Sequence, residues 1–177
     1  KAAELDGRHY ASPVNPIFLA TPDGLIEKED AGVELKAPGL RQASKWGDSW
    51  SGEFPEHYLA QCLWQMGVTG RPSWYLAALI GGQDFRVYRI ERDENLIAGL
   101  FDAAARFWRD HVLTDVAPEV DASDSARRYL ETVWPRNTQL IRLATPEEEA
   151  LARELAEARA AKAAAKEAAL LLQNKLC

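Results

Sequence analysis

Two carboxylates and a lysine lie close together near the start of the chain. Asp23 stands in a Pro-Asp-Gly turn, and a single residue, Leu35, separates Glu34 from Lys36. Carboxylate oxygens are the ligands that Mg²⁺ and Mn²⁺ prefer. An ammonium group beside them can hold an attacking water or stabilise charge that develops on phosphorus. These residues therefore form a candidate site for metal-dependent hydrolysis of a phosphodiester.

The segment that holds Glu34 and Lys36 has the pattern of a short strand. Apolar and charged residues alternate from Val33 to Ala37, and a Pro-Gly pair ends the alternation. Because side chains two residues apart point to the same side of a strand, Glu34 and Lys36 are expected on one face. The backbone carbonyl of Leu35 faces the strand edge and is a third candidate metal ligand. Taken alone, such a triplet more often marks an exposed face with alternating charges.

Asp23 lies between two apolar runs that predict strands. The first run covers residues 17–20 and leads into Thr-Pro-Asp-Gly, which is a strong turn signal. The second run begins with Leu25 and Ile26. If the strand before Asp23 pairs with the strand that holds Glu34, the two carboxylates converge.

The rest of the pattern predicts the elements that would hold these residues in place. Residues 39–53 are rich in Gly, Ser, Trp and charge, which predicts a long loop of the functional kind. The elements expected after this loop are a helix over 56–67, strands over 73–80 and 85–92, and a helix from Asp93 to about Val112. This order predicts an α/β fold with a small mixed sheet.

Beyond Pro118 the sequence predicts helices. A short helix covers residues 121–134, and a long one starts at the Thr-Pro pair at residue 145 and continues to the chain end. Its apolar residues repeat at spacings of four and three from Leu151 to Leu176, with one lysine in the series. Because three alanines make this apolar series thin, we expect the helix to pack on a partner helix or on the rest of the chain.

Composition argues against several classes of protein. The net charge of −6 weighs mildly against nucleic-acid binding, although a local basic groove can coexist with it. The two cysteines and three scattered histidines predict neither a disulfide framework nor a zinc site, and Cys62 is expected as a buried thiol. No apolar run approaches the roughly 20 residues that span a membrane, so a cytoplasmic protein is expected. The chain starts at Lys1 and not at Met, which suggests trimming at one or both ends.

The blocks Phe18–Leu25 and Val33–Pro38 resemble the PD-(D/E)xK nucleases in the order of apolar strand, Pro-Asp-Gly and Glu-x-Lys. More narrowly, the chain resembles the YqaJ-type phage recombinases, which are relatives of lambda exonuclease. The resemblance runs from roughly residue 14 to residue 113, in several separate blocks that keep the right order. The further blocks are Pro55–Tyr58, Ala60-Gln61, Trp64–Gly70, Trp74–Ala77 and Tyr88–Asp93.

The resemblance implies a fold and the roles of three residues. It implies a restriction-endonuclease-like core over residues 1–116, with a small mixed β-sheet flanked by helices, and a helical C-terminal extension over 117–177. It also implies that Asp23 and Glu34 bind the catalytic metal and that Lys36 is the catalytic lysine. The expected metal is Mg²⁺, with Mn²⁺ as an alternative.

Other residues join this trio as candidates. Gln61 matches the family's helix glutamine beside the active site and is a candidate catalytic residue. Tyr58 lies one turn earlier and is a candidate contact to DNA. Tyr58, Gln61 and Gln65 also share one polar helix face, which taken alone is more often a solvated side. Thr21 matches a small hydroxyl residue that relatives place near DNA phosphate.

The loop after Lys36 mixes basic and aromatic residues. Arg41 and Lys45 suit contact with phosphate, and Trp46 and Trp50 suit stacking on bases. A solvated loop whose tryptophans fold onto the core accounts for the same residues equally well.

The resemblance implies a Mg²⁺-dependent deoxyribonuclease, with a 5′ to 3′ exonuclease on double-stranded DNA ends as the first hypothesis. Its product strand would pass to a single-strand annealing protein during phage-type recombination in a bacterial host cell, and a ring-shaped homo-oligomer such as a trimer is the expected assembly. An endonuclease of the same fold and a non-catalytic DNA-binding or assembly module stay open. Relatives also carry an N-terminal helix with another acidic residue near the metals, which we expect upstream of Lys1 or on another chain.

Overall fold

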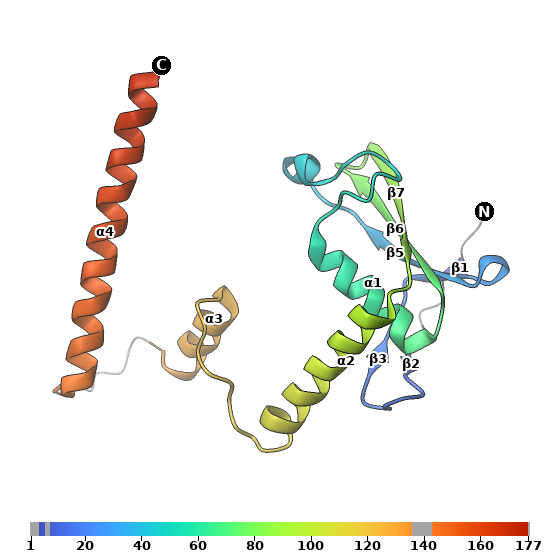
Figure 1. Ribbon diagram of the computed structural model, residues 1–177, viewed down its shortest axis with the longest axis horizontal. Helices are drawn as coiled ribbons and strands as arrows, with labels where there is room; N and C mark the ends of the chain where they lie inside the picture. Colours follow the sequence, from blue (N-terminus) through green and yellow to red (C-terminus); the bar gives the residue numbers. More distant parts are fainter. Residues whose placement is uncertain (1–3, 6–7, 136–142, 177) are drawn as a thin grey trace. The chain divides into compact units, whose positions relative to one another are not determined.

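The computed structural model describes residues 4–5, 8–135 and 143–176 (Figure 1). The chain divides into two compact units, residues 1–118 and 119–177. The first unit holds a mixed sheet with helices packed against it, and the second holds two helices. This is the α/β class that the sequence predicts, and the candidate site lies in the first unit.

Five strands form the main sheet, in the order β1-β4-β5-β6-β7. β5 and β6 are parallel, and the other neighbouring strands are antiparallel. Two parallel strands need a long crossover connection, which here contains helix α1. Strands β2 (Tyr10–Ala11) and β3 (Leu19–Ala20) pair in a separate two-stranded sheet. The strands of the main sheet are β1 (Glu4–Leu5), β4 (Gly24–Ile26), β5 (Ala31–Lys36), β6 (Ser73–Ile80) and β7 (Asp84–Glu91).

Small residues at the start of β5 suit its place at the centre of the sheet. Gly32 lies opposite Trp74 of β6, and a Cβ atom on Gly32 would lie 2.2 Å from Cη2 of that indole. The fully buried ring of Trp74 therefore fills the space that any larger residue at position 32 would need. This close approach lets a large aromatic side chain pack within the sheet's core.

Two helices cover one face of the main sheet. Helix α1 (Glu56–Thr69) packs against β6, and helix α2 (Glu94–Phe107) packs against α1. Asp93 caps α2 as predicted, because its carboxylate accepts hydrogen bonds from the backbone N–H groups of the second and third helical residues. The regular helix ends at Phe107, earlier than predicted, and a π-helical turn (η3, Trp108–Val112) continues it.

The segment between β5 and α1 is more ordered than the loop that the sequence predicts. It begins with the 3₁₀ helix η2 (Leu40–Lys45), and Trp46 directly after it is buried in the core. Trp50 is exposed, and its backbone N–H donates to the carbonyl of Val87 on the edge strand β7 at 2.9 Å. One predicted stacking residue is thus a core residue, and the segment covers part of the sheet's edge.

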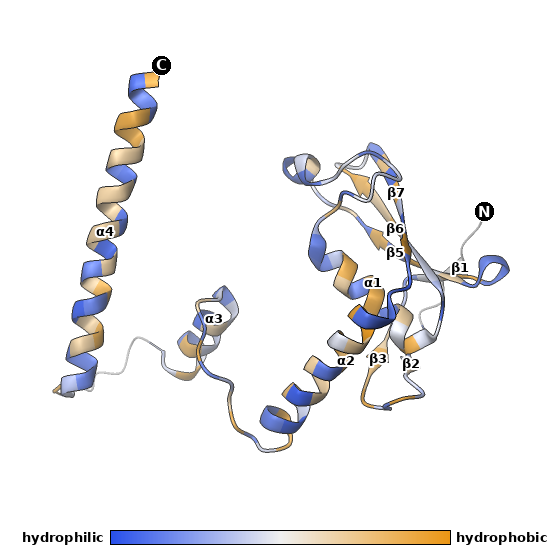
Figure 2. Cartoon of the chain, viewed as in Figure 1, coloured by the Kyte–Doolittle hydropathy of each residue, from blue (hydrophilic) through white to orange (hydrophobic). Residues whose placement is uncertain are grey.

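The other face of the main sheet is open in the first unit's described residues. Because side chains alternate along β5, Glu34 faces α1 while Val33 and Leu35 face away from it. A shallow apolar pocket of about 430 Å³ lies on that side, and it is lined by Ile26, Glu29, Val33, Leu35, Tyr75, Ala77, Phe85 and Val87. Figure 2 shows apolar residues in the central strands and in α1.

The second unit consists of α3 (Asp124–Val133) and α4 (Pro146–Leu176). The predicted capping box of α4 is present, because Thr145 and Glu148 exchange hydrogen bonds of 2.8 and 3.3 Å between side chain and backbone. The described residues of both helices include no buried side chain, and the leucines of the α4 seam are exposed. In the part of the chain that the structure describes, no helix has the length and apolarity needed to cross a membrane.

Candidate active site

The carboxylate of Glu34 is the centre of the site. Glu34 is only 3% exposed, and three side chains donate hydrogen bonds to it. Oε1 accepts from Nζ of Lys36 and from Nε2 of Gln61 at 2.6 Å, and Oε2 accepts from Nε2 of Gln65 at 2.8 Å. A carboxylate this deeply buried needs such donors, because loss of water disfavours its charged form.

Lys36 lies on the same face of β5 as Glu34, as the period of a strand predicts. Its ammonium forms an ion pair with Glu34 and lies 5.1 Å from the centre of the Tyr58 ring. That ring stacks on Trp46 with a centroid distance of 5.4 Å. The ammonium is thus held by a charge on one side and by an aromatic face on the other.

Asp23 is joined to the site through the backbone of β5. The pairing of β4 with β5 ends at Gly24 and Val33, and beyond that point Oδ2 of Asp23 accepts a hydrogen bond from the backbone N–H of Leu35 at 2.7 Å. In an extended strand the N–H and C=O of one residue point to the same edge. The carbonyl of Leu35 therefore faces the edge where Asp23 lies.

The strand pairing that connects Asp23 to the site involves β4 and not the apolar run at 17–20. The condition that this run pairs with the strand of Glu34 is not met, because β3 pairs with β2. Phe18 and Ala20 are buried in a separate cluster with Val68 of α1, which holds this run away from β5. The second predicted strand, β4, supplies the pairing.

Helix α1 carries both amides that contact Glu34. Gln61 and Gln65 are four residues apart and therefore lie on one side of the helix. Gln65 is buried, so the interpretation of this polar face as a solvated side is wrong for it. The sequence places Gln65 on the same helix face as Gln61 without assigning it to the site. Its spacing of four residues from Gln61 is the signal that points to it.

The predicted DNA contacts come from three separate segments of the chain. Thr21 is exposed two residues before Asp23, and its Oγ1 lies 2.7 Å from Nδ1 of His9. Arg41 and Lys45 are exposed on η2, which follows β5 along the chain. Tyr58 is partly buried against the core instead of projecting freely.

Cys62 is a buried thiol, as predicted. Burial, and next the negative charge of Glu34, raise its pKa to about 12, while the charge of Lys36 acts in the opposite direction. The thiol is therefore neutral at ordinary pH and is a poor nucleophile or metal ligand.

The oxygen atoms present could hold a hard divalent cation. They are the carboxylates of Asp23 and Glu34 and the carbonyl of Leu35, and Mg²⁺ commonly binds to one or two carboxylates while it keeps several waters. An ionised carboxylate has about four acceptor positions, so three hydrogen bonds leave one position on Oε2 of Glu34. Within the described residues, no group of three or more His, Cys, Asp and Glu side chains could hold a metal.

Comparisons with known proteins agree with this fold. Residues 4–72 match the model of the YqaJ-like viral recombinase domain. The uncharacterised protein YqaJ of Bacillus subtilis (strain 168) is 38% identical over 122 residues, which make up 67% of this chain and 37% of YqaJ. The chain therefore spans little more than a third of the length of that relative.

Two solved structures share the fold. One is the crystal structure of an alkaline exonuclease, LHK-Exo, from Laribacter hongkongensis, which is 20% identical with a TM-score of 0.53 over 75% of this chain and 64% of that chain. The other is LHK-Exo in complex with dAMP, which is 23% identical with a TM-score of 0.50 over 75% of this chain and 62% of that chain. The chain is thus similar to YqaJ, matches the YqaJ-like viral recombinase domain over residues 4–72, and shares the fold of this alkaline exonuclease.

Proposed function

We propose that this chain is the catalytic part of a metal-dependent deoxyribonuclease. The observation that carries the proposal is the buried carboxylate of Glu34, held between Lys36 and two amides of α1 beside Asp23. A buried ion pair with added polar contacts is a costly arrangement for stability alone. Such a cluster of charged groups next to a strand edge is typical of a catalytic site.

Lys36 has the arrangement needed to act on a phosphate. Its ammonium has three donors, and one of them is used on Glu34, which leaves two for a phosphate oxygen or for the attacking water. Glu34 and the ring of Tyr58 restrain the ammonium, so little reorganisation is needed when charge develops in the transition state.

Asp23, Glu34 and the carbonyl of Leu35 are the proposed ligands of Mg²⁺, and Mn²⁺ has the chemistry to replace it. When bound, the ion supplies activation of water and neutralises charge on the phosphate. Asp23 contributes further by fixing the backbone of Leu35, which keeps the carbonyl of that residue at the strand edge.

The proposed substrate is double-stranded DNA with free ends, cut from 5′ to 3′. Support comes from the family of recombinases to which the domain is similar and from the alkaline exonuclease that shares its fold. Thr21, Arg41 and Lys45 are exposed and are the proposed contacts to phosphate. A single-strand annealing protein as the partner, a ring-shaped oligomer and action in the host cytoplasm belong to the same proposal.

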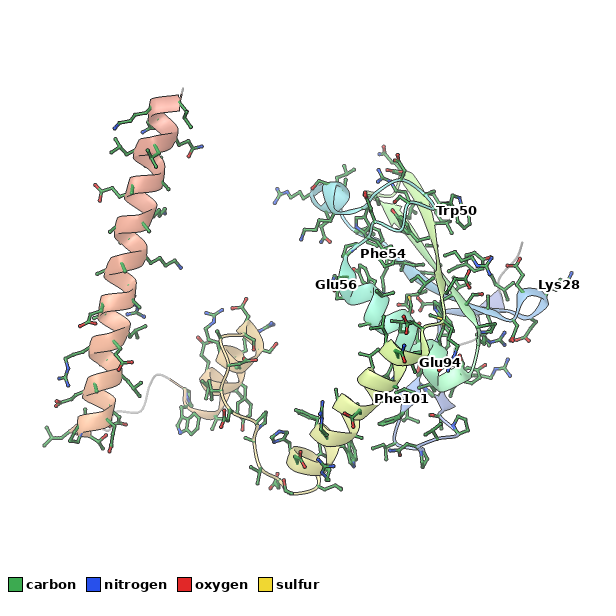
Figure 3. The ribbon with its side chains drawn as sticks, viewed as in Figure 1. Lys28, Trp50, Phe54, Glu56, Glu94 and Phe101 are labelled. Atoms are coloured by element: carbon green, nitrogen blue, oxygen red, sulfur yellow. The ribbon has the colours of Figure 1, made fainter. Side chains whose placement is uncertain are left out.

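The test uses the full-length protein, linear duplex DNA and Mg²⁺, with Asp23→Asn and Lys36→Ala as site variants. Matched controls are Asp102→Asn on the exposed side of α2 and Lys28→Ala, which Figure 3 shows at the tip of the turn between β4 and β5. We expect the rate of DNA cleavage by both site variants to fall at least about 100-fold, which is the typical cost of losing one catalytic group. Both controls should cleave DNA at the rate of the parent. Site variants that cut as fast as the parent would show that the site is wrongly assigned.

A DNA-binding module without catalysis is the second candidate. The observation in its favour is that the described residues give the site two carboxylates and no third one close enough to form a metal-binding group. Mg²⁺-independent binding of duplex DNA, with no cleavage of linear or circular DNA, would support the module. Cleavage of closed circles would instead point to an endonuclease.

A further inference from the structure

We infer that Gln65 is a positioning residue that fixes the carboxylate of Glu34 for metal binding. The inference rests on the proposed function, because it gives Gln65 a role in the same site. Gln65 does not touch the reacting atoms itself in this arrangement; it acts through Glu34, to which its Nε2 donates at 2.8 Å.

The two amides of α1 hold different oxygens of the same carboxylate. Gln61 donates to Oε1 of Glu34 at 2.6 Å, an oxygen that also accepts from Lys36. Gln65 supplies the hydrogen bond to Oε2. Because the terminal torsion of a glutamate is soft, holding both oxygens is what stops the carboxylate from turning. The hydrogen bond from Gln65 therefore selects the direction of the free acceptor position on Oε2.

The other end of the Gln65 amide argues against a packing role for this side chain. Gln65 is 4% exposed, and its Oε1 is buried without a hydrogen-bond partner among the described residues. A buried acceptor without a partner is destabilising, and an apolar side chain of similar volume would avoid it. Within the described part of the chain, only the N–H donor of the amide forms a hydrogen bond, and its acceptor is Glu34.

Burial also protects this contact from water. Gln65 lies in α1 between the buried residues Cys62 and Met66, so solvent does not compete for its N–H. Gln61, one turn earlier, is exposed and shares its oxygen with Lys36. Of the two amides, Gln65 is therefore the one whose loss leaves an oxygen of Glu34 without a protein donor.

The experiment compares Gln65→Leu and Gln65→Met with the parent in the full-length protein. Both replacements keep the volume and the burial but remove the donor, and the use of two covers the case in which one variant folds poorly. Val68→Ala is the control, because Val68 is buried in the same helix within a different cluster. Two quantities are measured for each: the rise in melting temperature with Mn²⁺ in the absence of DNA, and kcat and KM for linear duplex DNA across a Mg²⁺ titration.

We expect the Gln65 variants to need about 10 to 100 times more metal for half-maximal effect, or to lose kcat by that factor, as typical for residues that orient a metal ligand. KM for DNA should stay that of the parent, because no contact with DNA is removed. Val68→Ala should melt at a lower temperature but titrate with metal as the parent does.

Two results would overturn the inference. One is a parent-like metal titration in both Gln65 variants. The other is a weaker response to metal in the Gln65 variants that Val68→Ala shows to the same extent at an equal loss of melting temperature. That result would indicate a structural role for Gln65. A parent that binds Mn²⁺ through Asp23 but does not cut DNA would refute the proposed function alone, because the Mn²⁺ titration still decides the role of Gln65. A parent that shows no response to Mn²⁺ would contradict both.

Discussion

The environment of Glu34 illustrates how this fold accommodates a buried charge. Both carboxylate oxygens accept hydrogen bonds, and one of them also pairs with an ammonium group. These partners offset part of the loss of water, and they also fix the orientation of the group. Removing one partner is expected to cost more than the hydrogen bond itself, because it leaves a buried charge with an unfilled acceptor position.

The contact of Lys36 with Tyr58 gives a prediction at this scale. Tyr58→Leu removes the aromatic face 5.1 Å from the ammonium, whereas Tyr58→Phe keeps it. A cation–π contact of this kind contributes about 0.5–2 kcal/mol, so we expect kcat to fall by roughly 2- to 30-fold in the leucine variant and to change little in the phenylalanine variant. Steady-state kinetics on duplex DNA would check this. An effect on KM alone would instead indicate that Tyr58 contacts DNA, as the sequence predicts.

The sequence predicts part of the residue-scale arrangement. The period of two in a strand is enough to place Glu34 and Lys36 on one face, and the structure confirms it. The burial of Gln65 could not be predicted in the same way, because it depends on a contact across 31 residues of sequence. A helix face that looks polar in sequence is buried when the opposing strand supplies a matching polar group.

At the scale of elements, the contact between α1 and α2 holds the site helix in place. Gly67 of α1 lies against Ile97 and Phe101 of α2, and a Cβ atom on it would lie 2.7 Å from each of these side chains. Figure 3 labels Phe101 on α2. The missing side chain therefore lets the two helices approach closely, which supports the helix that carries Gln61 and Gln65.

Because of this close approach, replacing Gly67 by alanine and replacing Gly99 by alanine should have opposite effects on stability. Gly67→Ala should destabilise the protein by about 1–3 kcal/mol, because overpacking outweighs the better helix propensity of alanine. Gly99→Ala on α2, where a Cβ atom would meet nothing within 4 Å, should stabilise it by up to about 1 kcal/mol. Urea unfolding monitored by circular dichroism measures both. Equal effects of the two changes would contradict the packing described here.

Elements with a long periodic pattern are predicted well from the sequence, and short ones are not. α1, β6, β7 and α2 appear close to their predicted positions, because each repeats a helical or strand period over several turns or residues. β3 has two residues, too few to reveal a partner, and the packing of Phe18 and Ala20 decides its pairing with β2.

At the scale of the whole molecule, the charge distribution bears on DNA binding. The net charge is −6, yet Arg41 and Lys45 lie exposed in the segment that follows the site strand. Much of the acid lies elsewhere, including three glutamates in the first turn of α4. A chain with a negative net charge can therefore carry an exposed basic segment directly after its site strand in sequence, which the net charge alone does not predict.

The division into two units separates the part of the chain with a predicted function from the helical extension. The domain match and the candidate site lie within residues 1–118, and the helices of the second unit have no buried side chain among their described residues. The boundary at residue 116 and the role of the helical extension stay predictions. The sequence shows the resemblance to recombinases because the motifs lie in contiguous blocks. The arrangement around Glu34 could not be predicted in the same way, because it joins residues from β5 and α1.

The central claim is that Glu34 belongs to a metal-dependent nuclease site, and one measurement tests it most directly. The rate of nucleotide release from linear duplex DNA is compared for the full-length parent protein and Glu34→Gln, each with Mg²⁺, with EDTA, and with Mg²⁺ added back in excess over EDTA. Glutamine keeps the shape of the side chain but removes its charge. We predict that the parent loses activity in EDTA and regains it with Mg²⁺. Glu34→Gln should release nucleotides at least about 100-fold more slowly than the parent does with Mg²⁺, in all three conditions. Cleavage by the parent that persists in EDTA, or a Glu34→Gln variant as fast as the parent, would contradict the claim.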